Sequence, residues 1–172
     1  MSTRDDAPAA PVSSPGPVRL RTEVPLRWGD MDAYGHINNV EVLRLLEEAR
    51  VRAFGSPAFT GSPVHAPAVP LFNDLPEGTQ ALVVEHRIRY LAVLQYRDVP
   101  ATVLVWVSAL KGAGLTLAYE ILDGYDGSRR VIAETQLAFF HAPSAQLMRL
   151  SSEQRQALAA HRGESPFSAG RH

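Results

Sequence analysis

Residues 18–28 alternate between apolar and polar side chains, the pattern of a β-strand with one buried face. Every second position, starting at Val18 and ending at Trp28, is apolar or threonine, and the positions between them are charged or proline. Pro25 cannot donate a hydrogen bond to a neighbouring strand, which suits an edge strand or a bulge. The alternation therefore predicts a strand with one face turned toward a core.

Residues 39–54 change to steps of three and four between apolar positions, which is typical of an amphipathic helix. Asn38, with Glu41 three residues later, resembles an N-terminal capping box. Glu48 has an arginine four residues before it and another four residues after it, the spacing of helical ion pairs. The pattern predicts one helix over 39–54.

Four strand-like runs dominate the second half of the chain. Glycine-containing turns separate them, and their order along the chain predicts an antiparallel meander. In residues 101–109 both alternating sets are apolar, as expected of a central strand covered on both faces. The connection 55–78 is rich in proline and irregular, and 151–162 has a helical pattern. The four runs are 80–91, 99–109, 115–122 and 130–141.

Composition places these elements in one domain. The chain has 172 residues and 45% hydrophobic content, enough for a core that needs no disulfide bond or metal ion to fold. We expect a disordered arm over 1–17, a single domain over 18–162 and a flexible tail over 163–172. The fold class expected is α+β, an antiparallel sheet with one long helix.

Charge and residue usage narrow the functions further. There are no cysteines, and 17 Lys and Arg against 18 Asp and Glu give a net charge of -1. No disulfide framework, thiolate nucleophile or global basic surface for nucleic acid is therefore predicted. The first residues lack the apolar core of a signal peptide, and no run is long enough to span a bilayer, so we expect a cytoplasmic protein that does not bind membranes.

Other catalytic motifs find no match. The sequence has no Gly-x-Ser-x-Gly elbow, no phosphate-binding glycine loop and no histidine pair at i,i+4 spacing. The acidic turn at 123–127 lacks the ligands of a calcium loop and reads as a hairpin turn. No metal site and no cofactor are predicted.

Candidate chemistry gathers in residues 27–39, between the first strand and the helix. Two acids, a glycine, a histidine and two asparagines lie in this loop. A loop of this kind can hold a carboxylate beside unpaired N–H groups at the start of a helix, the two features that an acyl-transfer site requires.

The same segment carries a family resemblance. Residues 27–39 read RWGDMDAYGHINN and residues 47–50 read EEAR, similar to R-[WY]-x-D-x-D-x-x-G-H-x-N-N and E-x-A-R of 4-hydroxybenzoyl-CoA thioesterase-like acyl-CoA thioesterases. Residues 90–98 resemble a later segment, Y-L-x-P-x-x-Y-x-D. Val42 stands where relatives usually carry tyrosine, and Val93 where proline is common. The resemblance implies the hotdog fold, in which an antiparallel sheet wraps around one long central helix, and hydrolysis of acyl thioesters.

Residue roles follow from the resemblance. Asp32 matches the family's catalytic carboxylate, which acts as a nucleophile or as general base for water. Asp30 reads as a structural turn residue. His36 either orients the site and contacts the thioester, or only fixes the loop.

Five further residues are candidates for substrate binding. Gly35 permits a close backbone approach by the substrate, although a turn glycine has the same signature. Asn38 reads first as a helix cap, and Asn39 as a ligand contact. Arg87 and Arg89 alternate outward on one strand, where they could meet the phosphates of coenzyme A or only keep the sheet soluble.

The expected substrate is an acyl-CoA or acyl-carrier-protein thioester, and the expected assembly is a homodimer or homotetramer. One helix on a sheet leaves apolar strand surface that a second copy would cover. Glu48 and Arg50 are interpreted as a solvated or interfacial helix face. Two alternatives stay open: a hotdog dehydratase or hydratase, and a non-catalytic protein that binds acyl thioesters.

Overall fold

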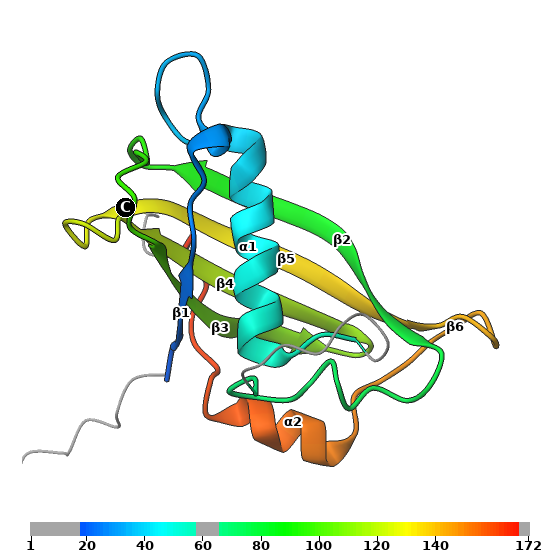
Figure 1. Cartoon of the computed structure of the whole chain (residues 1–172). Helices are drawn as coiled ribbons and strands as arrows, with labels where there is room; N and C mark the ends of the chain where they lie inside the picture. Colours follow the sequence, from blue (N-terminus) through cyan, green and yellow to red (C-terminus); the bar gives the residue numbers. More distant parts are fainter. Residues whose placement is uncertain (1–17, 58–65, 169–172) are drawn as a thin grey trace, which may run out of the picture.

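The computed structural model describes residues 18–57 and 66–168. The predicted arm and the last residues of the predicted tail lie outside this part. Its elements, in chain order, are β1 (Leu20–Val24), the 3-10 helix η1 (Trp28–Asp30), α1 (Asn39–Phe54), β2 (Thr79–Tyr90), β3 (Ala101–Lys111), β4 (Gly114–Leu122), β5 (Arg129–His141), β6 (Gln146–Leu147) and α2 (Ser152–Ala159). The predicted α+β class is confirmed: Figure 1 shows α1 lying across one face of an antiparallel sheet.

The sheet order corrects the predicted meander. The strands run β1-β3-β4-β5-β2, with β6 paired to the end of β5. β3, β4 and β5 form a meander, but β2 pairs with β5 rather than with β3. The connection 91–100 therefore crosses one end of the sheet, and β1 and β2 lie at opposite edges.

The first strand is also shorter than the alternation predicts. β1 ends at Val24, immediately before Pro25, and the chain turns through η1 at Trp28. Proline offers no N–H for the ladder with β3, so pairing stops there. The resulting turn brings the motif loop to one end of α1.

The helix agrees with the prediction at both ends. The side-chain oxygen of Asn38 accepts the N–H of Val40 at 3.1 Å, and Gly55 ends the helix with φ of 88°. A side chain at Gly55 would meet Asn73, so glycine is required there. Glu41 does not complete a capping box, because its carboxylate binds Arg44 at 2.9 Å instead.

The core lies between α1 and the inner face of the sheet. Val103, Val105 and Val107 of β3 are buried in one cluster with Leu45 and Leu46 of α1. The alternate set of β3 faces the other way, yet Trp106 is only 1% exposed. The two apolar faces of residues 101–109 predicted cover on both sides, and the second cover comes from the C-terminal segment.

Residues 163–168 lie against the outer face of the sheet, and we name them the strap. The N–H of Gly163 donates to the carbonyl of Val107 at 2.9 Å, and Trp106 Nε1 donates to the carbonyl of Glu164 at 2.9 Å. Figure 1 shows this segment (red) behind the sheet after α2. This part of the predicted tail is thus bonded to the fold.

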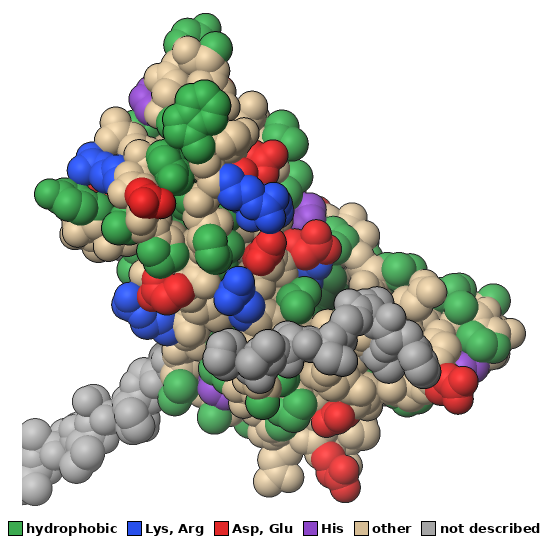
Figure 2. All heavy atoms as spheres, in the orientation of Figure 1, with side chains coloured by type: hydrophobic (Ala, Val, Ile, Leu, Met, Phe, Trp, Pro, Cys, Tyr) green, Lys and Arg blue, Asp and Glu red, His purple; other side chains and the backbone are tan. Residues whose placement is uncertain are grey.

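The opposite edge of the sheet is uncovered. β2 has no paired strand on its outer side within the described chain, and most of its residues are exposed. Exposed apolar side chains follow this edge and the connection after it: Leu82, Val83, Val84, Tyr90, Leu91 and Val93. In Figure 2 hydrophobic side chains gather at the end of the molecule where β2 and β6 lie. None of the helices among the described residues is long and apolar enough to cross a membrane.

Candidate active site

Asp30 anchors the loop that precedes α1. The residue is 4% exposed, and its Oδ2 accepts the N–H of Arg27 at 2.8 Å and a guanidinium N–H of Arg44 at 2.5 Å. Its carbonyl accepts the N–H of Asn38 at 2.8 Å. Asp30 thereby ties the start of the loop, its end and the second turn of α1 together, which is the structural role expected of it.

Asp32 lies in a tight turn within this loop. Its Oδ1 accepts the N–H of Tyr34 at 2.8 Å and that of His36 at 3.2 Å, while its own N–H donates to the carbonyl of His36 at 2.8 Å. Gly35 has φ of 76°, a left-handed conformation in which a side chain would be strained. Oδ2 of Asp32 has no hydrogen-bond partner among the described residues. One carboxylate oxygen is thus fixed by the backbone and the other is available.

A cavity of about 400 Å³ opens beside this carboxylate. Asp32 and His36 form its polar rim, and α1 contributes Val42 to its wall. The remaining lining residues are Ile37, Asn39, Tyr90, Leu91, Ala92, Val93, Leu94 and Val131. The site therefore has a mostly apolar pocket with a few polar groups at one side, as small-molecule sites commonly do.

Segments distant in the sequence hold this cavity together. The N–H of Ile37 donates to the carbonyl of Leu94 at 2.8 Å, and His36 bridges to Gln95. The hydroxyl of Tyr90 donates to the carbonyl of Asn39 at 3.2 Å, and burial raises the pKa of Tyr90. Tyr90 and the chain after it were not predicted as site residues, although they belong to the second segment of the family resemblance.

The helix start offers fewer free N–H groups than the sequence analysis assumed. Asn38 uses its side-chain oxygen for the N–H of Val40 and its carbonyl for that of Glu41. The N–H of Asn39 has no partner within the described chain. Asn38 thus acts as a cap, and the amide of Asn39 is the one left available for an oxyanion at this end of α1.

Arg87 and Arg89 are not brought to this cavity. Tyr90 and His86 of β2 face α1, and strand residues of odd number in this stretch face the other way. The guanidinium carbons of Arg87 and Arg89 lie 4.0 Å and 5.4 Å from the ring centre of Phe167 in the strap. The structure therefore places both arginines on the outer face of the sheet, opposite to the side that carries Asp32.

The burial of Arg50 differs from the prediction. Arg50 was interpreted as part of a solvated or interfacial helix face, but only 7% of it is exposed. Glu48 does lie on the outer side of α1, where its carboxylate is 3.6 Å from Arg44 and 3.8 Å from Arg52. The two residues thus point in different directions from one turn of the helix.

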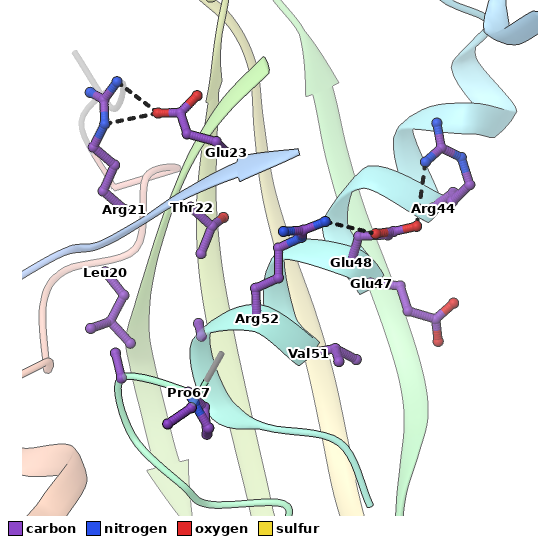
Figure 3. Close-up of a pocket in the computed structure, with 13 residues that line it drawn as sticks. Leu20, Arg21, Thr22, Glu23, Arg44, Glu47, Glu48, Val51, Arg52 and Pro67 are labelled. Atoms are coloured by element: carbon purple, nitrogen blue, oxygen red, sulfur yellow. Dashed lines mark hydrogen bonds and ion pairs between the residues drawn. The ribbon is translucent and has the colours of Figure 1, made fainter. Parts of the chain in front are cut away.

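A larger hollow, of about 960 Å³, lies between α1, β1 and residues 66–68 (Figure 3). It contains none of the residues of the Asp32 turn. Most of its charged side chains pair with one another: Arg21 with Glu23 at 2.8 Å, and Glu48 with Arg44 and Arg52. Figure 3 shows these pairs, with Leu20 and Val51 among the apolar residues that line the hollow. Size alone favours this hollow, but reactive groups favour the smaller cavity, because Asp32 and Asn39 both line it and each has one polar atom without a partner among the described residues.

No group of three or more histidine, aspartate or glutamate side chains in the described ranges is arranged to hold a metal ion. The polar groups that line the smaller cavity include the carboxylate of Asp32, the imidazole of His36 and the backbone of Asn39.

Comparison with protein families gives one match. A model of the Thioesterase-like superfamily matches residues 26–158. A search of curated proteins found no match.

Solved structures match over most of their length. A predicted thioesterase from Bacillus stearothermophilus has a TM-score of 0.67 at 18% identity, covering 86% of this chain and 98% of that one. The DHNA-CoA thioesterase from Staphylococcus aureus has a TM-score of 0.65 at 19% identity, covering 81% and 87%. The probable thioesterase YbaW from Escherichia coli has a TM-score of 0.61 at 22% identity, covering 83% and 98%.

These structural matches confirm the hotdog fold, and the family model covers both the motif loop and the cavity wall. The chain therefore belongs to the Thioesterase-like superfamily.

Proposed function

We propose that this protein hydrolyses acyl-CoA or acyl-carrier-protein thioesters at the cavity beside Asp32. One observation carries the proposal: Asp32 and Asn39 line the same mostly apolar cavity, and among the described residues neither Oδ2 of Asp32 nor the amide of Asn39 has a partner. Family membership and the resemblance to structures described as CoA thioesterases support the choice of a thioester over other acyl compounds.

In the proposed reaction, the acyl group occupies the apolar cavity with its carbonyl carbon beside Asp32. The carboxylate either removes a proton from an attacking water, or attacks the carbonyl itself to form a mixed anhydride that water then hydrolyses. In both routes the C–S bond breaks, and the thiolate leaves and takes up the proton that water releases. As the carbonyl oxygen gains negative charge, the N–H of Asn39 and the positive end of the α1 dipole stabilise it. His36 and Gly35 contact the substrate from the same turn, and Asn38 positions the amide by capping the helix.

Asp32→Asn tests the chemistry with almost no change of shape. The asparagine keeps an oxygen that can accept the N–H groups of Tyr34 and His36, so the turn should survive. It lacks the basic oxygen, so turnover should fall on the order of 100-fold or more. Release of free thiol from a panel of acyl-CoA esters measures this directly.

Asp74→Asn is the matched control, because Asp74 is exposed in the connection before β2 and lies outside the cavity. It should retain full activity. Near-full turnover in Asp32→Asn would remove Asp32 from the mechanism. Conversion of the acyl group without thiol release would identify the lyase alternative, and binding without conversion would identify the non-catalytic one.

We further propose a homodimer as the minimum assembly, with a tetramer as the larger option. The free edge of β2 and its exposed apolar side chains are the surface for the second copy. Tyr90 and Val93 belong both to this surface and to the cavity wall, so the second copy would also close the site. Light scattering should report a dimer or larger; a monomer that hydrolyses thioesters at full rate would exclude a shared site.

A further inference from the structure

A polar cluster, buried except at His86, lies on the inner face of the sheet, away from the Asp32 loop. It consists of Arg50 from α1, His86 from β2, Tyr119 from β4 and Thr135 from β5. Arg50 is 7% exposed, and Tyr119 and Thr135 are fully buried. His86 Nδ1 and Thr135 Oγ1 are 2.9 Å apart. Because His86 is exposed, it lies on the open side of the cluster.

Two donors in this cluster have no acceptor. Nη1 of Arg50 and the hydroxyl of Tyr119 are buried and make no hydrogen bond within the described residues. The Arg50 side chain has one anionic partner, Glu47 at 3.2 Å, and the Glu47 side chain is 67% exposed. Buried donors without partners, and a buried charge with a poorly buried counterion, are both unfavourable. An acceptor with negative charge would relieve both.

Arg50 influences the pKa of both other titratable groups of the cluster. Burial raises the pKa of Tyr119, and polar interactions with Arg50 and Thr135 partly offset this. Burial and then the charge of Arg50 lower the pKa of His86, while Glu47 acts in the opposite direction. Arg50 therefore lies within electrostatic range of both the Tyr119 hydroxyl and the His86 ring, so the cluster is one site rather than scattered polar residues.

The cluster lies in line with the proposed acyl cavity. Successive rows of side chains across the inner face are Tyr90 with Val131, Ile88 with Ala133 and Tyr119, and His86 with Thr135. The first row lines the cavity. The third lies four residues along the strands, about 13 Å away. On α1, Val42 lines the cavity and Arg50 lies eight residues later, about 12 Å along the axis.

We propose that Arg50 and Tyr119 bind a carboxylate at the far end of the acyl chain, so that the enzyme selects ω-carboxyacyl thioesters over simple fatty acyl thioesters. This inference rests on the proposed function, because it takes Asp32 as the place where the thioester is cleaved. In this proposal the acyl chain of the substrate runs past Ile88, from the cavity beside Asp32 to the polar cluster. Its carboxylate accepts from Nη1 of Arg50 and from the Tyr119 hydroxyl, and His86 closes the open side.

Pairs of CoA esters test the proposal. Each pair has one chain length and ends either in a methyl group or in a carboxylate, and kcat/KM is measured from thiol release. The carboxylate ester should be preferred only at the length that spans the two sites. Tyr119→Phe keeps the ring in the core but removes the donor, and should lower that preference about tenfold, the loss expected for one hydrogen bond to a charged group. Arg50→Met should abolish it.

Tyr125→Phe makes the same chemical change at an exposed position in the turn between β4 and β5, and should leave the preference unchanged. A purely structural cluster would alter stability in Tyr119→Phe but not the ratio between the two esters. Equal ratios in Tyr119→Phe and Tyr125→Phe, or no preference for the carboxylate at any length, would overturn the inference while the thioesterase function stands.

Absence of cleavage would count against the proposed thioester hydrolysis but not against the carboxylate-binding site. If neither ester of any pair is cleaved, the shift of the thermal unfolding midpoint with each ester replaces turnover as the measurement. A larger stabilisation by the carboxylate ester, lost in Tyr119→Phe, would support the binding site without hydrolysis. Equal stabilisation by both esters would overturn the binding site as well.

Discussion

Asp30→Asn should destabilise the protein by about 2 kcal/mol, although Asp30 takes no part in the proposed chemistry. Oδ2 of Asp30 accepts from Arg27 N and from Arg44 Nη2. Asparagine keeps one acceptor oxygen for the backbone N–H but loses the charge-assisted bond to the guanidinium. Hydrogen bonds to charged groups contribute about 1.5–3 kcal/mol.

The remaining partners of Arg44 limit the loss. Its guanidinium keeps Glu41 at 2.9 Å and Glu48 at 3.6 Å, and 21% of its side chain is exposed. The charge is therefore not left uncompensated, and the cost stays below the roughly 3–5 kcal/mol that follows when a fully buried ion pair is broken.

Urea unfolding measures the difference in the free energy of unfolding. Glu41→Gln is the matched control, since it also removes a carboxylate from Arg44 but at a side chain that is 33% exposed, where about 1 kcal/mol or less is expected. Asp32→Asn should change stability little, because its oxygen can still accept the two turn amides. The interpretation of Asp30 as the anchor is refuted if Asp30→Asn costs no more than Glu41→Gln.

Three further changes probe the cap, the strap and the buried cluster. Asn38→Ala should cost about 1 kcal/mol in urea unfolding, because the helix loses its cap; an unchanged midpoint would contradict that role. Phe167→Ala should cost about 1–2 kcal/mol through lost apolar burial and cation–π contact, and should redden the fluorescence of Trp106 if the strap detaches. Since burial and Arg50 lower the pKa of His86, the unfolded chain binds its proton first, so stability should fall as pH drops below about 6.5 and level off below the folded pKa. His86→Gln should reduce this fall, measured as the unfolding midpoint at neutral and mildly acidic pH.

Local patterns predicted the local structure well. The helix period, the cap at Asn38 and the glycine at position 55 fixed α1 at the predicted bounds, because each acts within a few residues. The two apolar faces of residues 101–109 correctly indicated a central strand. The identity of the second cover was not predictable, since the strap carries no periodic apolar face and is held by backbone bonds to Val107 and by Trp106.

Strand order and side-chain direction were harder to predict. Nothing in the run 80–91 distinguishes β5 from β3 as its partner, because pairing between distant strands depends on the whole sheet. Arg50 was misread for a related reason. It lies on a helix rich in charged residues, and only the position of Tyr119 and Thr135 in the sheet shows that its guanidinium is directed inward.

The candidate site combines both kinds of information. Short-range bonds fix Asp32 relative to Asn39: Asp30 holds both ends of the loop, the Asp32 turn closes on itself, and Asn38 occupies the two neighbouring helix amides. This part is encoded within about a dozen residues, which is why the motif could be read from the sequence. The wall from Tyr90 onward comes from the far edge strand and joins the loop through Leu94. The reactive groups are therefore preorganised by one segment, while the space for the acyl group is set by the edge where we expect the second copy, so substrate choice and assembly should depend on the same residues.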